Sequence, residues 1–231
     1  MTSVYNTSKI IFKKHFTFSL ICGIMASEKG RCINLTKAEQ MQELLEKRNG
    51  YLLSQDVIES GISKTYMSEF VKKYDLERVA QGVYMSADTW QDDLYILCLK
   101  NTKAILSYET ALHIHELTER EPSETHVSVP YTYNAKHLRD RGVCVHQITN
   151  DLYDMGTTTA TTKFGNPVTV YDMERTICDM VKARSKKDAQ IFLYAIKEYS
   201  RSKKKDIGKL MRYAERLDVA DEVRTYMEVL L

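Results

Sequence analysis

Residues 50–85 read GYLLSQDVIESGISKTYMSEFVKKYDLERVAQGVYM, and this stretch decides the predicted fold. Its apolar spacing and its turn residues predict a helix, a tight turn, a second helix and then a short hairpin. This order is typical of a winged helix-turn-helix, which usually places its second helix in the major groove of DNA. The stretch indicates the fold more directly than it indicates DNA binding.

Capping and turn residues set the expected boundaries of the two helices. Ser54 is the expected N-cap of a short helix over 55–60, and Gly61 lies where the turn needs a residue that tolerates positive φ. Ser63 is the expected N-cap of the next helix, which ends near Tyr74. Helical spacing predicts that this helix buries Ile62, Tyr66, Met67, Phe70, Val71 and Tyr74.

Elements on either side complete the predicted winged domain. Upstream, Thr36-Lys37-Ala38-Glu39 fits a capping box, so a helix is expected to begin there and to end at Asn49-Gly50. Downstream, 76–79 and 83–85 predict two strands that are joined by a tight turn at Gln81-Gly82. The whole domain is therefore expected to occupy residues 36–87.

The outward face of the second helix is the candidate DNA-reading surface. Short polar side chains near its start suit base edges, and lysines near its end suit phosphates. The candidate DNA-binding residues are Ser63, Lys64, Thr65, Ser68, Lys72 and Lys73 on the helix, with Arg78 and Gln81 in the hairpin. The alternative is an ordinary solvated helix face, because acidic and basic residues are about equally frequent in 36–85.

Charge and cysteine content exclude several classes of protein. The net charge of +2 gives no general affinity for nucleic acid, so such binding requires local clustering of basic residues. The 5 cysteines are scattered without a CxxC pair, which argues against a disulfide framework and against a structural zinc site. This cysteine usage indicates a reducing, cytoplasmic environment.

The composition and the element pattern predict an α+β protein in three parts. Residues 1–35 form an N-terminal extension, 36–87 the winged domain, and 88–231 a mixed α/β domain that ends in a helical bundle. The extension loosely resembles a signal peptide, but its apolar run over 16–26 is too short to span a bilayer, so no membrane partner is expected. It is predicted to be poorly ordered or to reflect an over-long start; the alternative is a targeting or packing segment.

The third part is expected to mix helices and strands before it becomes all helical. Its apolar patterns predict helices at 90–100 and 108–117, strands at 104–106, 126–129 and 143–148, and a hairpin formed by 157–164 and 167–171. From Asp172 to the end only helices are predicted, with breaks near Ser185, Ser202 and Leu217–Asp218.

Three stretches together resemble the AbiEi family of antitoxins from bacterial abortive-infection toxin–antitoxin operons. They are LERVAQGVY at 76–84, ILSYETAL at 105–112 and VTVYDMERTICD at 168–179. The resemblance covers about residues 40–231, and its specificity lies in the order of the three stretches, since none of them is a catalytic motif. The N-terminal extension departs from the pattern of the family.

The resemblance implies a winged domain that binds operator DNA and represses its own operon. It also implies that the C-terminal domain counters a toxin of the nucleotidyltransferase type, without requiring a stable complex between the two proteins. Operators of this family are commonly inverted repeats, so two copies of the chain are expected on DNA. The family therefore implies a transcription regulator in phage defence, with no enzymatic activity of its own.

Possible catalytic and metal sites are weak in the sequence. Glu174-Arg175-Thr176 opens a predicted helix for which Asp172 is the candidate N-cap. Arg175 can pair with Asp179 on the next helical turn. The alternative is that Arg175 contacts the other domain or a partner. His113 and His115 do not share a helix face, and His126, His137 and His146 have no ligand partners nearby in the sequence. No catalytic residue, metal ligand or cofactor site is therefore predicted.

Two alternative functions belong to other classes. A metal-dependent nuclease would need an Asp followed by an acidic-x-Lys strand between Thr125 and Tyr171, and no such pattern is evident. A protein-interaction adaptor would use the winged domain to contact protein instead of DNA.

The strongest basic cluster lies between residues 182 and 212. It is interleaved with tyrosines and is a candidate surface for phosphate contacts or for toxin counteraction. The alternative is a set of solvated helix faces. The residues assigned to this surface are Lys186, Lys187, Lys197, Arg201, Lys203, Lys204, Lys205, Lys209 and Arg212.

Overall fold

The protein is described from a computed structural model that covers residues 35–230, except for the side chain of Lys186. The chain divides into two units, 1–42 and 43–231, and the described residues of each are treated by themselves. The predicted N-terminal extension over 1–35 lies outside the described residues apart from Leu35. The proposed boundary near residue 87 stays a prediction.

In the first unit the predicted capping box is confirmed. The amide of Thr36 donates to Glu39 Oε2 at 2.7 Å, and the amide of Glu39 donates to Thr36 Oγ1 at 3.3 Å. These bonds satisfy two amides at the start of a helix that would otherwise lack partners. The helix that begins here is α2 (Lys37–Lys47).

The second unit opens with a small antiparallel sheet. Its strands are β1 (Tyr51–Leu53), β2 (Glu77–Ala80) and β3 (Val83–Met85), in the order β1-β3-β2. The predicted hairpin is confirmed to within one residue, because Ala80 pairs with Val83 across the Gln81-Gly82 turn. Strand β1 was not predicted, since 3 residues are too few to show an alternating pattern.

Two helices lie between β1 and the hairpin, α3 (Ser54–Glu59) and α4 (Lys64–Lys73). Ser63 is confirmed as the N-cap of α4, but the prediction that Ser54 caps α3 is wrong. Leu53 occupies that cap position, and the Ser54 amide donates to the Gly82 carbonyl at 2.9 Å. Because β1 runs directly into α3, the last residue of the strand becomes the cap.

The predicted buried face of α4 is correct at its start and wrong at its end. Ile62, Met67 and Phe70 are buried, whereas Tyr74 is 45% exposed. Residues four apart advance about 40° around a helix at each step, so Tyr74 has rotated away from the direction of Ile62. Its ring instead packs against Phe70, with the ring centroids 4.3 Å apart.

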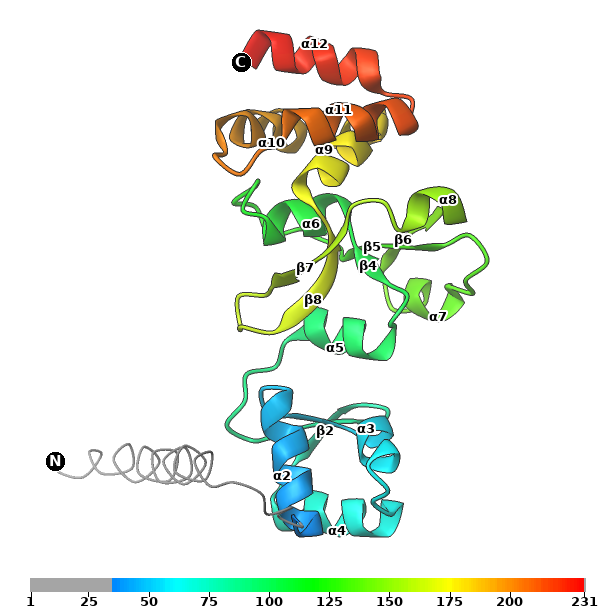
Figure 1. Cartoon of the computed structure of the whole chain (residues 1–231), viewed down its shortest axis with the longest axis vertical. Helices are drawn as coiled ribbons and strands as arrows, with labels where there is room; N and C mark the ends of the chain where they lie inside the picture. The colour runs from blue at the N-terminus through cyan, green and yellow to red at the C-terminus, as the bar shows by residue number, and fades with distance from the viewer. Residues whose placement is uncertain (1–34, 231) are drawn as a thin grey trace, which may run out of the picture. The chain divides into compact units, whose positions relative to one another are not determined.

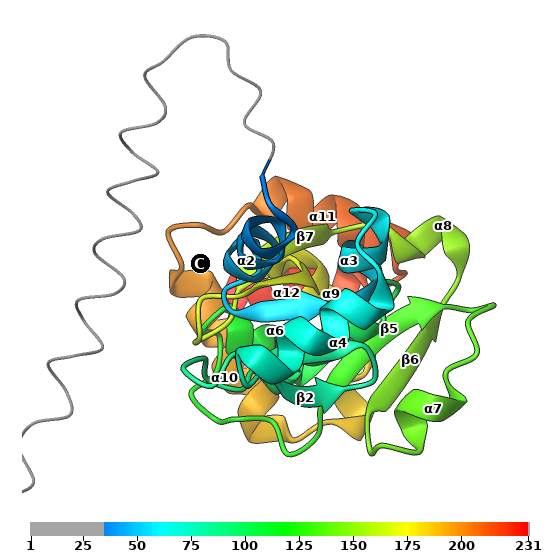
Figure 2. The ribbon, with the colours of Figure 1, turned by 90° about the horizontal axis from the view of Figure 1, so that it is seen from below.

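A mixed five-stranded sheet forms the middle of the second unit, in the order β6-β5-β4-β8-β7. Strand β4 runs antiparallel to β5 and parallel to β8, β5 runs parallel to β6, and β7 runs antiparallel to β8. Figure 2 shows β5 and β6 side by side. The strands are β4 (Ile105–Leu106), β5 (His126–Pro130), β6 (Cys144–Ile148), β7 (Thr157–Thr161) and β8 (Pro167–Tyr171).

Four helices accompany this sheet. The two longer ones were predicted, and the two four-residue helices were not, because one turn of helix leaves no periodic pattern. They are α5 (Asp93–Lys100), α6 (Tyr108–Ile114), α7 (Lys136–Arg139) and α8 (Asn150–Tyr153). Strand β7 also ends at Thr161, earlier than the predicted 164.

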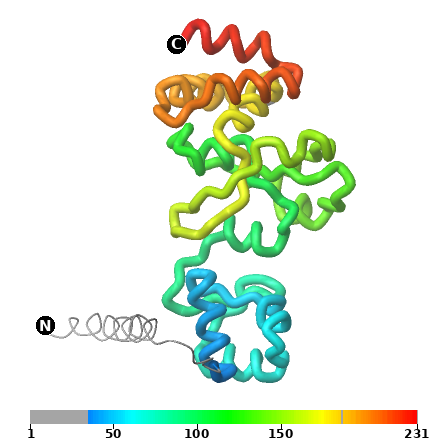
Figure 3. Tube along the Cα trace, in the orientation of Figure 1, coloured from blue at the N-terminus to red at the C-terminus, as the bar shows by residue number. Residues whose placement is uncertain are grey.

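The C-terminal part is helical, as predicted, with breaks at the expected places. Figure 1 and the trace in Figure 3 show its α-helices gathered together. They share a buried cluster that includes Ile177, Ile196, Leu210 and Val223. The elements are α9 (Met173–Lys182), η1 (Arg184–Lys186), α10 (Ala189–Arg201), α11 (Ile207–Arg216) and α12 (Ala220–Leu230).

Hydrogen bonds connect the small sheet to the mixed α/β part within the second unit. The Asn49 amide group donates to Asn166 Oδ1 at 3.0 Å. The hydroxyl of buried Tyr51 donates to the Trp90 carbonyl at 3.0 Å and accepts from the Asp92 amide at 2.9 Å. Asn166 in turn donates to Asp92 Oδ2 at 2.8 Å. We call these five residues the Asn49–Asn166 junction.

The fold is therefore mixed α+β with two sheets, as the element order predicted at the level of fold class. Among the helices of residues 35–230, none is long and apolar enough to cross a membrane.

Candidate nucleic-acid interface

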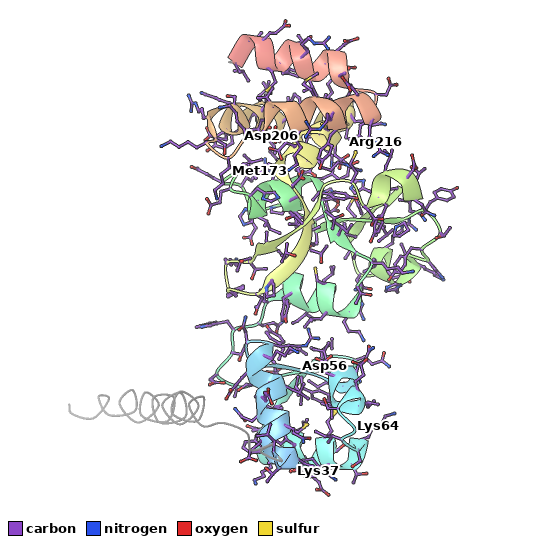
Figure 4. All side chains as sticks on the ribbon, in the orientation of Figure 1. Lys37, Asp56, Lys64, Met173, Asp206 and Arg216 are labelled. Atoms are coloured by element: carbon purple, nitrogen blue, oxygen red, sulfur yellow. The ribbon has the colours of Figure 1, made fainter. Side chains whose placement is uncertain are left out.

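Helix α4 is positioned by the residues that it buries and by its cap. Ile62, Met67 and Phe70 fix one face of the helix against the protein, so the opposite face points to solvent. Ser63 Oγ accepts from the Tyr66 amide at 3.3 Å and holds the first turn. Figure 4 labels Lys64 at the start of the exposed face.

The predicted DNA-binding residues of α4 are all exposed, but they do not form a single stripe. Lys64, Thr65, Ser68 and Lys72 fall within an arc of about 100° at helical spacing, whereas Lys73 lies about 180° from Lys64. Ser68 Oγ donates to the Lys64 carbonyl at 3.0 Å, and Ser63 Oγ is engaged as the cap. Lys64, Thr65 and Lys72 are therefore the side chains best placed to reach a ligand.

The hairpin presents the two remaining candidates, Arg78 and Gln81, to solvent. The Gln81 carbonyl accepts from Lys100 Nζ at 2.6 Å, which ties the turn to α5. Arg78 lies opposite Tyr84 in the register of β2 and β3. A guanidinium on a fixed strand and an amide on a fixed turn suit backbone phosphates better than base edges.

Two residues of the basic cluster between 182 and 212 form ion pairs that are buried or half-buried. Lys187 Nζ lies 2.8 Å from Glu109 Oε2, and its side chain is only 10% exposed. Lys209 Nζ lies 3.0 Å from both Asp172 Oδ2 and Glu174 Oε2. Burial opposes the charge of Lys209, but the two carboxylates raise its pKa. These two lysines stabilise the fold and leave little charge for a ligand.

The other members of the cluster divide by their contacts. Arg201 Nη1 lies 3.3 Å from Glu198 Oε1 at the end of α10, and Lys205 Nζ donates to the Ser202 carbonyl at 3.5 Å. The side chain of Lys186 lies outside the described residues. The side chains of Lys197, Lys203, Lys204 and Arg212 are exposed, as is that of Arg201. Figure 4 labels Asp206 and Arg216, which bracket the helix that carries Arg212.

Arg175 is structural, and its predicted pairing with Asp179 is confirmed. Its Nε donates to Asp179 Oδ1 at 3.0 Å, and both side chains are almost fully buried. Its Nη1 donates to the carbonyls of Leu152 at 2.7 Å and Met155 at 3.0 Å. Asp172 is also confirmed as the cap of α9, through its contact with the Arg175 amide at 2.8 Å. Arg175 therefore holds α8 and the loop after it, which explains its buried charge.

The sequence indicated no ligand partners near His126 and His146 along the chain, and the fold brings the two histidines together. His126 Nδ1 lies 3.1 Å from His146 Nε2, and Cys144 Sγ lies 3.6 Å from the same nitrogen. Burial lowers the pKa of His126, and burial also lowers the pKa of His146 to about 4. The only sequence signal was the alternation Cys144-x-His146, which places both side chains on one face of a strand. We call these three residues the His126–Cys144–His146 cluster.

The remaining histidines of residues 35–230 do not form such a group. His115 Nε2 lies 2.6 Å from the Tyr171 carbonyl, and His137 Nε2 lies 2.8 Å from Asn101 Oδ1. His113 Nδ1 is buried without a hydrogen-bond partner. The side chains of His113 and His115 therefore do not converge on a single ligand position.

An acidic cavity of about 870 Å³ lies between the start of α5, the end of α6 and the loop after β7. Its lining includes Asp93, Glu116, Glu119 and Glu198. Carboxylates at this density repel a phosphate backbone. The cavity is therefore no part of a nucleic-acid interface.

The four strands β5 to β8 have the sequences HVSVP, CVHQI, TTTAT and PVTVY. None of these strands carries an acidic residue. The geometry of a restriction-type nuclease, which requires carboxylates on a central strand, is absent from them.

Comparison with known proteins gives a likeness of fold only. No protein-family model and no curated protein matches the chain. A crystal structure of the RV2827C protein from Mycobacterium tuberculosis is similar, with a TM-score of 0.52 and 11% sequence identity. The similarity covers 86% of this chain and 82% of that protein. The arrangement of most of this chain is thus shared with a solved protein.

Proposed function

We propose that this chain is a DNA-binding autorepressor and antitoxin of the kind that the AbiEi family represents. The observation that carries the DNA-binding proposal is the element order α2-β1-α3-α4-β2-β3 with the sheet order β1-β3-β2. A helix-turn-helix followed by a hairpin that returns beside it is the plan of a winged helix. In that plan α4 is the recognition helix, and the β2–β3 hairpin is the wing.

The exposed face of α4 supports major-groove contact. Thr65 carries a hydroxyl that suits a base edge, and Lys64 and Lys72 flank it with charges that suit phosphates. Arg78 and Gln81 of the wing then contact the adjacent backbone. The near balance of charge in this region means that affinity depends on these few residues.

The exposed basic residues after α9 supply the remaining phosphate contacts or the surface that counters the toxin. The residues proposed for this role are Lys197, Lys203, Lys204 and Arg212 of the basic cluster between 182 and 212. Two copies of the chain bind an inverted-repeat operator. The toxin is a nucleotidyltransferase, which the chain counters in the cytoplasm without a stable complex, a cofactor or catalysis of its own.

A mobility-shift assay of the full chain on the DNA upstream of its own operon tests the proposal. We expect a specific shift whose affinity falls steeply with salt, because each phosphate contact releases a counterion. Replacing Lys72 and Lys73 together by Glu should abolish the specific shift. The single variant Lys64→Glu should weaken binding and reduce the slope of log affinity against log salt by about 1.

A matched double variant controls for the general effect of charge reversal. Lys136 and Arg141 are exposed basic residues on and after α7, a helix that Figure 1 shows apart from α4 and from α10 and α11. Lys136→Glu with Arg141→Glu changes the net charge by the same amount and should leave the shift intact. Normal operator binding by the Lys72/Lys73 double variant would show that α4 is not the recognition helix.

The antitoxin role is tested separately in cells that express the neighbouring reading frame. If that frame encodes a nucleotidyltransferase toxin, the chain should restore growth. We expect the Lys72/Lys73 double variant to restore growth as well, provided that both genes are expressed from foreign promoters. Failure of the wild-type chain to restore growth would contradict the antitoxin role while leaving DNA binding intact.

Two rival functions appear as distinct outcomes of these experiments. A winged domain that contacts only protein would give no shift on the upstream DNA even at low salt. A nuclease would cleave plasmid or tRNA in the presence of magnesium, and acidic residues between 125 and 172 would be needed for that cleavage.

A further inference from the structure

Strands β5 and β6 bring two histidines and a cysteine together on one face of the sheet. The strands run parallel, with His126 opposite Cys144 and Ser128 opposite His146. Side chains alternate between the faces of a strand, so Cys144 and His146 point the same way, and the register places His126 beside them. The ligand atoms Nδ1 of His126, Sγ of Cys144 and Nε2 of His146 all lie within 4.8 Å of one another.

These contacts converge on one point instead of forming a chain of hydrogen bonds. His126 Nδ1 lies 3.1 Å and Cys144 Sγ lies 3.6 Å from the same atom, Nε2 of His146. An imidazole nitrogen offers one in-plane direction, either a lone pair or an N–H, so it cannot make two good in-plane hydrogen bonds at once. A cation at the point of convergence would satisfy all three atoms.

The spacing of the three atoms fits a tetrahedral zinc ion. Bonds of about 2.0–2.1 Å to nitrogen and about 2.3 Å to sulfur, at tetrahedral angles, place two nitrogens about 3.3 Å apart and a nitrogen and a sulfur about 3.6 Å apart. The observed separations are 3.1 Å for the histidine pair and 3.6 Å for Cys144 and His146. Imidazole and thiolate ligands together favour Zn²⁺ over Mg²⁺ or Ca²⁺, which prefer oxygen.

The surroundings of His126 have the features of a ligand-orienting shell. Its other ring nitrogen, Nε2, lies 3.3 Å from Glu109 Oε2, so the N–H that remains after metal binding has a carboxylate to donate to. Metal-bound histidines commonly donate their second N–H to a carboxylate, which fixes the ring and makes it a better ligand. Lys187 Nζ holds the same carboxylate oxygen at 2.8 Å.

His146 is held from the other side. The ring of Tyr108 stacks on it, with the centroids 3.8 Å apart and an interplanar angle of 26°. Tyr108 has a φ of 49°, which places this non-glycine residue in the left-handed region. Such conformations persist only where the surrounding structure enforces them. The stack therefore restricts the orientation of a ring whose Nε2 must point at the other two ligands.

We propose that His126, Cys144 and His146 form a Zn²⁺ site whose fourth position is open to water. Cys144 and His146 are only partly buried, so solvent and metal can reach the site. The site uses none of the residues assigned to DNA binding. It goes beyond the proposed function, and each proposal can fail without the other.

Cobalt titration of the full chain, stripped of metal by a chelator, tests the site. Co²⁺ adopts the same tetrahedral geometry, and its thiolate complexes show a charge-transfer absorption in the near ultraviolet. We expect this band to saturate at one equivalent of Co²⁺ and to disappear when Zn²⁺ is added. Zn²⁺ should also raise the melting temperature, because a metal that binds only the folded state stabilises it.

Substitutions in the His126–Cys144–His146 cluster test whether the charge-transfer band arises from Co²⁺ bound there. Cys144→Ser should remove the charge-transfer band, and His146→Asn or His126→Asn should each weaken binding of Co²⁺. Cys98→Ser, which alters a half-buried cysteine of α5, is the matched control and should leave the titration unchanged. Cys22, Cys32 and His15 occur elsewhere in the sequence, so every comparison is made in the full chain.

Substitution of Glu109 distinguishes a metal site from a cluster of side chains that only pack together. Glu109→Gln should lower the affinity for Zn²⁺ by about 10–100-fold while retaining the charge-transfer band, because it removes the carboxylate that orients His126 and leaves the thiolate. Circular dichroism of each variant verifies that it is folded. A wild-type chain without the band, or a band that persists in Cys144→Ser, would overturn the proposal.

Discussion

One buried charged side chain, that of Arg175, binds several segments of the structure at once. Arg175 is fully buried, and one carboxylate and two backbone carbonyls accept from it. Its position followed from the sequence, since Asp179 stands one helical turn later. The carbonyls of Leu152 and Met155 could not be predicted, because they come from α8 and the loop after it, 20 or more residues away, whose path only the fold determines.

We expect Asp179→Asn to destabilise the protein by about 3–5 kcal/mol, because it leaves the guanidinium of Arg175 buried without a counter-charge. Urea denaturation followed by circular dichroism measures the change. Asp221→Asn is the control, since Asp221 pairs with Arg224 at the surface and its side chain is 94% exposed. Equal effects of the two substitutions would contradict the role of burial.

His115 makes the stability of the protein depend on pH. Burial lowers its pKa, although its contact with the Tyr171 carbonyl acts in the opposite direction. Because the pKa of the folded state lies below the ordinary value of about 6.5, the unfolded chain takes up a proton first as the pH falls. The stability contributed by neutral His115 is thus present above about pH 6.5 and is lost as the pH falls towards the lowered pKa.

His115→Gln keeps a donor for the Tyr171 carbonyl and removes the titration. We expect the free energy of unfolding to fall less steeply between pH 7.5 and pH 5 in this variant than in the wild type. Urea unfolding at several pH values measures both slopes. Identical slopes would show that His115 has the same pKa in the folded and unfolded states.

Among the elements, the longer helices and the strands that flank turns were predictable, whereas the one-turn helices α7 and α8 and the pairing of the strands were not. Capping residues such as Thr36, Ser63 and Asp172 mark helix starts by local chemistry, so the sequence alone locates them. His126 and Cys144 are 18 positions apart in the chain, and only the parallel register of β5 and β6 makes them neighbours. The His126–Cys144–His146 cluster was missed for this reason.

The turn before β7 depends on a glycine for two separate reasons. Gly156 has a φ of +81°, and a Cβ at this position would lie 2.6 Å from Cβ of Arg175. We expect Gly156→Ala to destabilise the protein by about 2–4 kcal/mol, the sum of a left-handed backbone and a clash in a packed region.

Gly142→Ala separates the two causes. Gly142 has a φ of +76°, and a Cβ added there would meet nothing within 4 Å, so only the backbone strain applies. We expect a loss of about 1 kcal/mol there, measured by the same urea denaturation. A loss at Gly142 as large as that at Gly156 would show that Arg175 moves aside without cost.

At the scale of the whole molecule, the second unit has a core that extends across the predicted domain boundary. Tyr51, Val83 and Met85 from the small sheet share one hydrophobic cluster with Tyr95 of α5 and Val170 of β8. Sequence patterns place apolar residues inside a domain, but they do not show which two domains bury them together. The predicted division near residue 87 was drawn from local signals alone.

We therefore expect residues 43–230 to unfold in a single transition. Far-ultraviolet circular dichroism reports on the helices, and the fluorescence of Trp90, the single tryptophan, reports on the Asn49–Asn166 junction to which it belongs. The two probes should give the same midpoint in urea. Asn166→Ala should lower both midpoints together, because it leaves Asn49 and Asp92 without a partner that they share.

The deuterium exchange rate of the buried backbone amide of Asp92 reports on opening of the Asn49–Asn166 junction. This amide donates to the hydroxyl of Tyr51, which belongs to the small sheet, while the Asp92 carboxylate caps α5 through the Tyr95 amide at 3.1 Å. Its deuterium exchange thus requires β1 and the start of α5 to separate, and the exchange rate measures the free energy of that opening. If operator DNA slows the exchange of this one amide, then DNA binding at α4 stabilises the mixed α/β part through the contact of Tyr51 with Asp92.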